Sequence, residues 1–391
     1  MARPADQVRA RSTLMRGGTS KCWVFEAHEL PVGRSGRERV LSAAYGGADP
    51  RQINGIGGGT STTSKAIVIE AVDRTARQVD YSFAQVSIDR ERVEWSSNCG
   101  NCATAVALYA VQSGAVEPTG DWTTLSIRNI QTGLLLDADV ATPGGRSTNL
   151  FGASDDPAAA GVPVDLLFRP PTWTTFGALL PTGNAIDVLE SGGRRIRATL
   201  IDAGAPAVLA DAADLGLTGS ETVAQLSRHI GDFASLRAAA AVRMGLPADG
   251  LAVPKVGVVA PPAAADHDLA CRMISMTAPH PSIGLTSAVA VAAAAGVSGS
   301  VLQGLVPGLA AANDVRALRI GTASGVTTVE VQLPGPSAVR IKRSARRLVN
   351  GSVFVPMETI PAQASSPETH PDTTILEDES EGARQSEPVK K

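Results

Sequence analysis

The chain has 391 residues, a formal net charge of -3 at pH 7 and only 4% aromatic residues. A near-neutral chain without clustered basic and aromatic residues is not expected to bind nucleic acid, and its apolar segments are too short or too often interrupted to span a membrane. Four cysteines, at positions 22, 99, 102 and 271, are too few for a disulfide framework in so long a chain. We therefore expect a soluble protein of the reducing cytoplasm.

Short strands are expected along the chain, because 39 glycines and 25 prolines interrupt it. β-Branched residues and partial alternation of apolar side chains indicate strands at residues 65–72, 79–88, 123–130, 194–203 and 327–333. Two further segments, 102–114 and 286–296, consist almost entirely of Ala and Val and have no polar face. A helix that is apolar on every side must be buried on every side, so the sequence predicts two buried helices.

The two predicted helices resemble each other. Each follows a polar turn that contains glycine and ends at a Gly followed by a Val, and Cys99 and Thr286 at their starts lie 187 residues apart. This spacing indicates an internal duplication. We predict an α+β fold of two pseudo-symmetric lobes, followed by a tail rich in Pro, Ser, Thr and Glu that is too poor in apolar residues to fold. The predicted parts are an N-terminal lobe at 10–178, a C-terminal lobe at 179–337, a final strand at 338–357 that returns to the N-terminal lobe, and a disordered acidic tail at 358–391.

The segment SSNCGNCATAVALYAV, Ser96–Val111, places a C-x-x-C pair at the start of the first predicted helix. A zinc site would need about four ligands at short spacing, and a thioredoxin-like dithiol would need a βαβ surround; the sequence provides neither. Cys99 at a helix start would instead lie beside free backbone N–H groups, which attract anions and lower the pKa of a thiol. Simple burial of both cysteines is the alternative, and Cys102 is expected to pack as a small hydrophobic residue.

Two loops rich in glycine and hydroxyl groups precede predicted strands. The loop INGIGGGTSTTSKAIVI, residues 53–69, offers N–H groups and hydroxyls to an oxyanion and ends in Lys65. A lysine at the entrance to an apolar strand can have its pKa lowered by desolvation and act as a base, although a solvated lysine is the common alternative. The loop LMRGGTSKCWVF, residues 14–25, repeats the pattern and has an ordinary hairpin turn as its alternative. Together these segments predict one pocket for a polycarboxylate.

Six segments resemble, in the same order, motifs of the PrpF family: MRGGTSKCWVF, GGGTSTTSK, SSNCGN, PTGNAIDVL, RMISMTAPH and RSARRLVNGSVFVP. The resemblance covers residues 10–357. It implies a cofactor-independent isomerase of unsaturated di- or tricarboxylates, such as 2-methylaconitate, aconitate, methylitaconate or 4-oxalomesaconate. It also implies a fold similar to diaminopimelate epimerase, in which each lobe is a β-barrel-like sheet around a central helix and the active site lies between the lobes.

The resemblance also implies roles for individual residues. Lys65 and Cys99 are the implied catalytic residues: Lys65 would remove an allylic proton and return it at the other allylic carbon, while Cys99 would orient the substrate or act as the opposing acid or base. The implied substrate-binding residues are Arg16, Thr19, Ser20, Thr62, Thr63, Ser64, Gly100, Asn101, Arg272, Thr286 and Ser287. No metal and no organic cofactor is expected. A small polycarboxylate is the expected partner, and a homodimer is left open.

Departures from the family pattern concern the substrate more than the reaction. Thr286 stands where the related epimerases have a second cysteine, which argues against a two-thiol epimerase of amino acids. Ser287 and Cys22 replace usual glycines, and Ala205 replaces a usual Asn. The alternatives that remain are a keto–enol tautomerase of the 4-oxalomesaconate type and a non-catalytic protein that binds carboxylates.

Overall fold

The computed structural model describes residues 7–356, except residues 48, 89, 96–97, 149–160 and 171–173. The predicted tail at 358–391 therefore lies outside the described residues. Within the described part, seventeen strands are joined by hydrogen bonds into one sheet. No helix of this part is long and apolar enough to cross a membrane.

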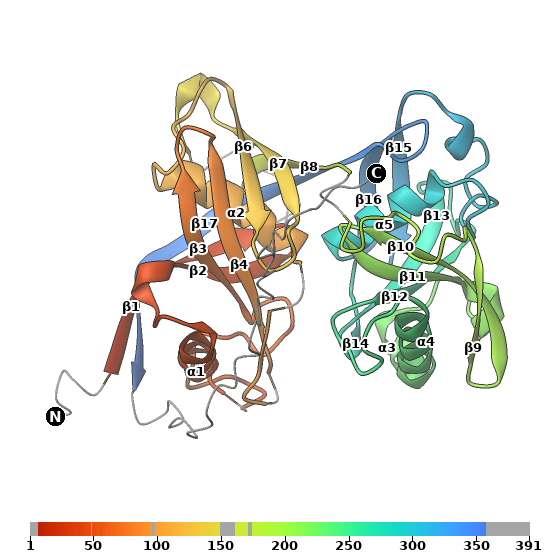
Figure 1. The fold of residues 1–391 in the computed structure, drawn as a ribbon, viewed down its shortest axis with the longest axis horizontal. Coiled ribbons are helices and arrows are strands. Elements are labelled where there is room, and N and C mark those ends of the chain that lie inside the picture. The colour runs from red at the N-terminus through yellow and green to blue at the C-terminus, as the bar shows by residue number, and fades with distance from the viewer. Residues whose placement is uncertain are drawn as a thin grey trace, which may run out of the picture. The chain divides into compact units, whose positions relative to one another are not determined.

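Among the described residues, the first half of the chain contributes eight strands and two α-helices (Figure 1). They are β1 (Gln7–Gly17), β2 (Ser20–Glu26), α1 (Arg34–Tyr45), β3 (Lys65–Asp73), β4 (Gln78–Val86), β5 (Val93–Glu94), α2 (Gly100–Gln112), β6 (Trp122–Asn129), β7 (Leu135–Ala141) and β8 (Val162–Phe168). Short 3-10 helices in the same half span Ala27–Glu29 and Pro143–Gly145.

The second half contributes the remaining strands and helices. They are β9 (Asp187–Ser191), β10 (Arg194–Ala203), β11 (Ala205–Asp211), α3 (Val223–Leu226), α4 (Ile230–Arg243), β12 (Lys255–Ala260), β13 (Leu269–Ser275), β14 (Ala278–Pro279), α5 (Leu285–Ala295), β15 (Val315–Thr322), β16 (Gly325–Gln332) and β17 (Ala338–Pro356). Its 3-10 helices span Ala212–Leu215, Ser227–His229 and Leu309–Ala311.

The two halves repeat one order of strand pairings. In the first half, β1–β2 is antiparallel, β2–β3 parallel, β3–β4 antiparallel and β4–β6 parallel. In the second half, β10–β11, β11–β12, β12–β13 and β13–β15 follow the same sequence of directions. Each half also inserts a short strand, β5 or β14, and then a buried helix, α2 or α5, before the second parallel pair. The predicted α+β fold with pseudo-symmetric halves is therefore confirmed.

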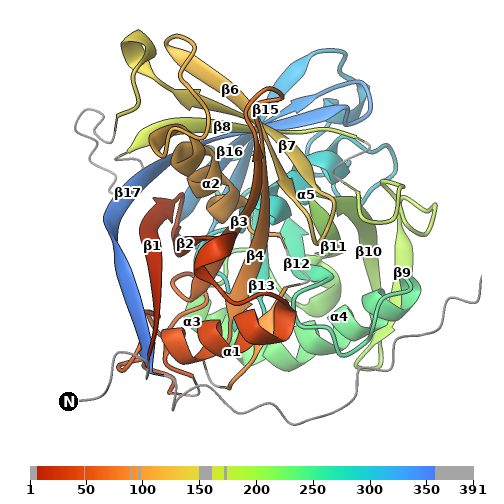
Figure 2. The same cartoon turned by 60° about the vertical axis from the view of Figure 1, so that its left-hand side comes forward.

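Strand β17 joins the two halves. Its first residues pair with β16, the following residues pair with β8, and the remainder pairs with β1 along the whole length of that strand. The figures show β17 passing from the second half to lie beside β1 at the edge of the first half (Figures 1 and 2). In the first half, β1, β2, β3, β4, β6, β7, β8 and β17 thus form a continuous circuit of pairings around α2. A closed circuit leaves few free strand edges.

The buried helices α2 and α5 form the centre of the main hydrophobic core. All residues of α5 and all of α2 except Tyr109 and Gln112 are buried. The expected segments, 102–114 and 286–296, differ from the observed helices by only one or two residues at each end. Small Ala and Val side chains keep the helices narrow, so that strands can pack closely around them. The prediction of two buried helices is confirmed.

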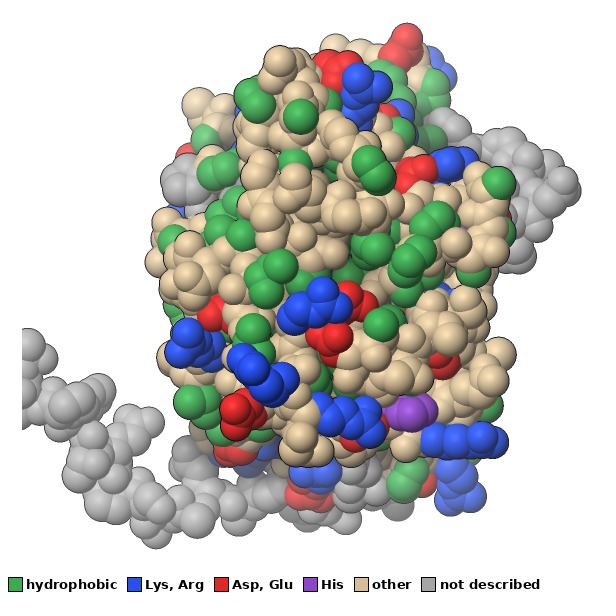
Figure 3. All heavy atoms as spheres, turned by 90° about the vertical axis from the view of Figure 1, so that its right-hand side faces the viewer, with side chains coloured by type: hydrophobic (Ala, Val, Ile, Leu, Met, Phe, Trp, Pro, Cys, Tyr) green, Lys and Arg blue, Asp and Glu red, His purple; other side chains and the backbone are tan. Residues whose placement is uncertain are grey.

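The surface carries charges of both signs. On the face shown in Figure 3, most basic side chains lie next to acidic ones, and hydrophobic side chains are scattered between them. In the second half, Arg197 pairs with Asp214 at 3.0 Å and Arg319 pairs with Asp268 at 2.7 Å. Exposed ion pairs of this kind contribute at most about 1 kcal/mol each to stability.

Candidate active site

A small pocket lies where the N-terminal ends of α2 and α5 meet. Its volume is about 70 Å³, which is room for about five water molecules. The residues that line it come from both halves of the chain: Ser20, Ser61, Thr62, Lys65, Phe83, Gln85, Asn98, Cys99, Gly100 and Asn101, and then Lys255, Met273, Ile274, Ser275, Met276, His280, Gly284, Leu285, Thr286 and Ser287.

The two helix starts are in close contact. A Cβ added to Gly100 would lie 2.7 Å from both Cβ and Cδ2 of Leu285, so only glycine fits at the first position of α2. The first N–H groups of a helix have no partner within it and form the positive end of the helix dipole. Two such ends therefore point at one small pocket, which favours an anion there.

Lys65 reaches the pocket from the first residue of β3. Its side chain is buried, with 8% of its surface exposed. Its Nζ donates a hydrogen bond of 2.5 Å to Oε1 of Gln85 and lies 5.2 Å from the centre of the Phe83 ring. Gln85 in turn donates to the carbonyl of Ser64 at 2.9 Å, which fixes the orientation of its amide. Lys65 is therefore held in one place by its neighbours and is directed at the pocket.

Cys99 is the N-cap residue of α2, and its Sγ accepts a hydrogen bond from the backbone N–H of Cys102 at 3.4 Å. The Cys102 thiol and then burial raise the pKa of the Cys99 thiol well above its usual value. The expectation that the helix start lowers this pKa is therefore wrong, because these two effects outweigh the lowering by Lys65 and by the backbone N–H of Cys102. Cys102 is fully buried in the core, as predicted. All four cysteines are free thiols.

The polar groups beside Cys99 are joined by Asn101. Its Nδ2 donates to Oγ1 of Thr19 at 3.0 Å and lies 3.4 Å from Oγ of Ser20. Ser20 and Asn101 are both buried and both line the pocket. Thr62, from the loop that precedes β3, lines it as well. Thr19 does not line this pocket but lines a neighbouring cavity. The hydroxyl loops of the first half are thus brought together with the start of α2.

Some predicted substrate-binding residues do not line the pocket. Arg16 donates to the carbonyl and the hydroxyl of Ser344, both at 2.9 Å, and so ties β1 to β17. Thr63 bonds to Oγ1 of Thr60 at 2.7 Å, and the buried Ser64 donates to Oε1 of Gln52 at 2.5 Å. These contacts stabilise the loop that carries Thr62 and Lys65.

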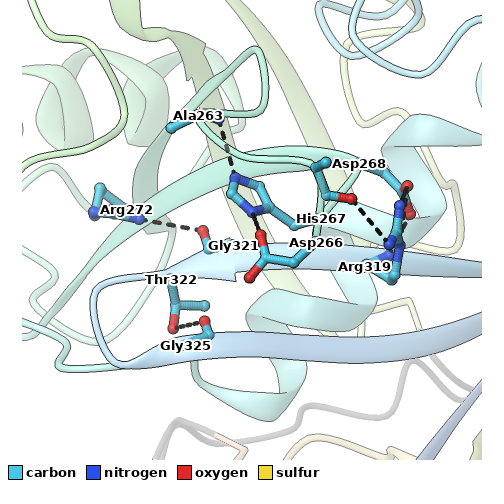
Figure 4. A network of polar contacts seen from close by, with 10 residues as sticks. Ala263, Asp266, His267, Asp268, Arg272, Arg319, Gly321, Thr322 and Gly325 are labelled. Carbon is cyan, nitrogen blue, oxygen red and sulfur yellow. Dashed lines mark hydrogen bonds and ion pairs between the residues drawn. The ribbon is translucent and has the colours of Figure 1, made fainter.

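Arg272 also lies outside the residues that line the pocket. Its Nε donates to the carbonyl of Glu221 at 2.7 Å, and its Nη1 donates to the carbonyls of Cys271 and Gly321 at 2.9 and 3.2 Å. Figure 4 shows the guanidinium directed at Gly321, next to the contacts of His267 with Asp266 and of Asp268 with Arg319. Arg272 therefore joins neighbouring backbone segments of the second half.

Thr286 and Ser287 line the pocket, but neither occupies the position of Cys99. The N-cap residue of α5 is Gly284, and Thr286 is the second residue of the helix, as Asn101 is in α2. The place of the missing second thiol is therefore taken by Gly284, which has no side chain. Both hydroxyl residues are almost fully buried and lie beside the free N–H groups of the helix start.

Two titratable residues that line the pocket, Lys255 and His280, were not predicted from the sequence. Lys255 is the first residue of the apolar strand β12, as Lys65 is the first residue of β3. His280 accepts a hydrogen bond at Nδ1 from the N–H of Ser282 at 3.0 Å, so its proton lies on Nε2. Burial lowers the pKa of His280 to about 4, which keeps its ring neutral at pH 7.

The pocket is positively charged. Two lysines line it, and among the described residues no Asp or Glu does. Elsewhere in the described part, no group of three or more His, Cys, Asp or Glu side chains is arranged to hold a metal ion. The side chains at this site can bind carboxylates and can accept or donate protons.

Comparison with known proteins identifies the family. The family model described as PrpF protein matches residues 7–356. This chain belongs to the PrpF family. Within the family, a 2-methyl-aconitate isomerase of Shewanella oneidensis is 35% identical to this chain. The alignment includes 90% of this chain and 98% of the isomerase. A 4-oxalomesaconate tautomerase of Pseudomonas putida is 36% identical, and the alignment again includes 90% of this chain and 98% of the relative.

Solved structures agree with this assignment. A crystal structure of a methylitaconate-delta-isomerase matches with a TM-score of 0.72 and 27% identity, over 94% of this chain and 100% of the other. A hydroxyproline epimerase from Agrobacterium vitis shares the fold alone, with a TM-score of 0.55 and 16% identity over 90% and 93% of the two chains. The epimerase-like fold is confirmed, and the chain is an isomerase of the PrpF family.

Proposed function

We propose that this isomerase moves a proton and a carbon–carbon double bond within an unsaturated di- or tricarboxylate, such as aconitate, 2-methylaconitate or methylitaconate. The observation that carries the proposal is the charge of the pocket, which combines two lysines with two helix starts and, among the described residues, no acidic side chain. A buried positive charge without a partner is costly, and a substrate with two or three carboxylates would compensate it. The names of the relatives support the same class of acids.

Lys65 is the general base of this proposal. The proton to be moved lies on a carbon that is next to a C=C bond and close to carboxylates, so its removal gives an anion that is delocalised onto their oxygens. The amine of Lys65 takes this proton, and the N–H groups at the two helix starts stabilise the developing charge. Gln85 and Phe83 position the amine.

Cys99 is the acid of this proposal. Its raised pKa keeps the side chain a thiol at neutral pH, so Cys99 has a proton to give. Transfer of the thiol proton to the far allylic carbon completes the shift of the double bond and leaves a thiolate. The proton that Lys65 gained returns to this thiolate, directly or through water, before the next turnover.

The test is proton exchange in deuterated water. The protein is incubated with cis-aconitate, 2-methylaconitate and methylitaconate, and NMR follows deuterium uptake and migration of the double bond. We expect both for at least one acid, and neither for Lys65→Ala. Lys342→Gln, on the exposed side of β17, is the control and should be fully active. Exchange that survives Lys65→Ala would contradict the role of the base, and no exchange with any acid would contradict the function.

A second candidate is a keto–enol tautomerase. It is favoured by the 36% identity to the 4-oxalomesaconate tautomerase of Pseudomonas putida, and it would use the same base and the same positive pocket. Adding 4-oxalomesaconate to the same NMR experiment separates the two, because conversion of the keto acid alone would assign the tautomerase.

A further inference from the structure

Lys65 and Lys255 occupy equivalent places in the two halves. Lys65 is the first residue of β3 and Lys255 the first residue of β12. The strand register is also the same: Trp23, the fourth residue of β2, pairs with Ala66, and Val208, the fourth residue of β11, pairs with Val256. The internal symmetry therefore brings one lysine from each half to the same pocket, which both of them line.

The choice of lysine at both places is unusual for this sequence. The chain contains 29 arginines and only 6 lysines, at positions 21, 65, 255, 342, 390 and 391. Within the described residues, two of the four lysines face one pocket of about 70 Å³. Arginine stays charged at all working pH values, whereas a partly buried lysine can lose its proton. Among the described residues, the pocket is thus lined by two lysines and by no arginine.

Lys255 differs from Lys65 in its contacts. Among the described residues, its Nζ has neither a carboxylate at ion-pair distance nor a hydrogen-bond acceptor. By contrast, Nζ of Lys65 is held by Gln85. An ammonium group directed into a pocket without a counter-ion is ready to bind an anion. Lys65 is restrained as a base would be, and Lys255 is free to pair with a carboxylate.

We propose that Lys255 is a second catalytic lysine, which holds a substrate carboxylate from the second half of the chain and stabilises the negative charge that develops there when Lys65 removes the proton. The proposal rests on the proposed function of the same pocket. It deepens that function, because it assigns one substrate carboxylate to Lys255 and leaves a second carboxylate to the N–H groups of the helix starts. Lys255 would act in its protonated form and Lys65 as the base.

The surroundings of Lys255 give the proposal a pH signature. Burial lowers its pKa from 10.5 to about 8. Lys255 interacts electrostatically with charged or titratable groups from several elements. They are Lys65 on β3, Arg237 on α4, Cys99 at the start of α2, Glu94 on β5 and His280 before α5. Since the active form is protonated, kcat/KM should fall as pH rises through about 8. The Cys99 thiol does not cause this fall, because its pKa is raised well above 9.0.

The experiment compares charge-conserving and charge-removing variants at both lysines. We expect Lys255→Gln to lower kcat/KM by about 100-fold or more, the usual effect of losing one group that stabilises an oxyanion. Lys255→Arg should keep much of the activity and lose the alkaline fall near pH 8, because arginine stays protonated. Lys65→Arg should be inactive, because arginine cannot accept the proton. Lys342→Gln, which removes an exposed lysine, should change neither kcat/KM nor the pH profile.

A binding measurement covers the case in which Lys255→Gln folds poorly. Propane-1,2,3-tricarboxylate has no double bond and cannot react, so its affinity reports carboxylate binding alone. Its Kd should rise at least tenfold in Lys255→Gln and stay near the wild-type value in Lys255→Arg. The inference is overturned if Lys255→Gln keeps wild-type kcat/KM, or if Lys255→Arg keeps the alkaline fall. An active Lys65→Arg variant would contradict the proposed function instead, so the two failures can be told apart.

Discussion

Gly100→Ala tests the contact between the two helix starts. The added Cβ would lie 2.7 Å from Cβ and Cδ2 of Leu285, whereas carbon atoms in contact are about 3.5–4.0 Å apart. Leu285 cannot avoid the clash by rotating its side chain, because its own Cβ is one of the two atoms. The helix starts must therefore separate by about 1 Å. Such overpacking costs about 1–3 kcal/mol of stability, and a displacement of 1 Å at a catalytic site can cost about 100-fold in rate.

The assay for Gly100→Ala combines thermal unfolding with isomerase kinetics. We expect Tm to fall by a few degrees and kcat/KM to fall by about 100-fold. Gly231→Ala is the matched control, because Gly231 is the second residue of α4 and an added Cβ there meets nothing within 4 Å. That control should be neutral or slightly stabilising, since alanine favours a helix over glycine by up to about 1 kcal/mol. Wild-type Tm and kinetics for Gly100→Ala would refute the close approach of the two helices at the site.

Three further predictions concern single residues. Cys99→Ser should abolish double-bond migration because serine is a much weaker acid. Cys102→Ala should cost about 1 kcal/mol of stability and leave kcat/KM unchanged. Equal kinetic losses in the two variants would refute the different roles of the two cysteines. Arg272→Gln should lower the unfolding free energy by about 2 kcal/mol or more and leave the KM of the folded enzyme unchanged, and a large rise in KM would instead place Arg272 at the substrate. The lowered pKa of His280 means that the unfolded chain takes up its proton first as pH falls. Stability should therefore decline between about pH 6.5 and pH 4, and His280→Gln should reduce this slope in urea titrations.

The buried helices could be predicted because their sequences allow only one environment. A run of Ala and Val without a polar face, as in α5, must be enclosed by other elements. The pairing of β17 could not be predicted in the same way. Its residues pair with β1 more than 300 positions earlier in the chain, and local periodicity carries no information about which distant strand becomes the partner.

The candidate site was predictable where a local motif carries it and unpredictable where packing decides. Lys65 and the Cys99 cap come from motifs that present their chemistry locally. The sequence around Lys255 contains no distinctive motif. Its position in the pocket follows only from the strand register, which is the same in both halves. The pKa of Cys99 depends on the neighbouring Cys102 thiol and on burial, which no sequence pattern specifies. Arg272 is a similar case, since its backbone partners are set by the tertiary fold.

The duplication has been kept unequally in the two halves, and this inequality bears on the chemistry. Both halves retain a lysine at the start of the third strand and a helix start at the pocket, so these two features are symmetric. The thiol is not symmetric, because Cys99 caps α2 whereas Gly284 caps α5. An enzyme that exchanged a proton between two faces of one carbon through two thiols would need both caps. One thiol together with two lysines suits a reaction in which the proton leaves one carbon and a proton arrives at another while the carboxylates stay fixed.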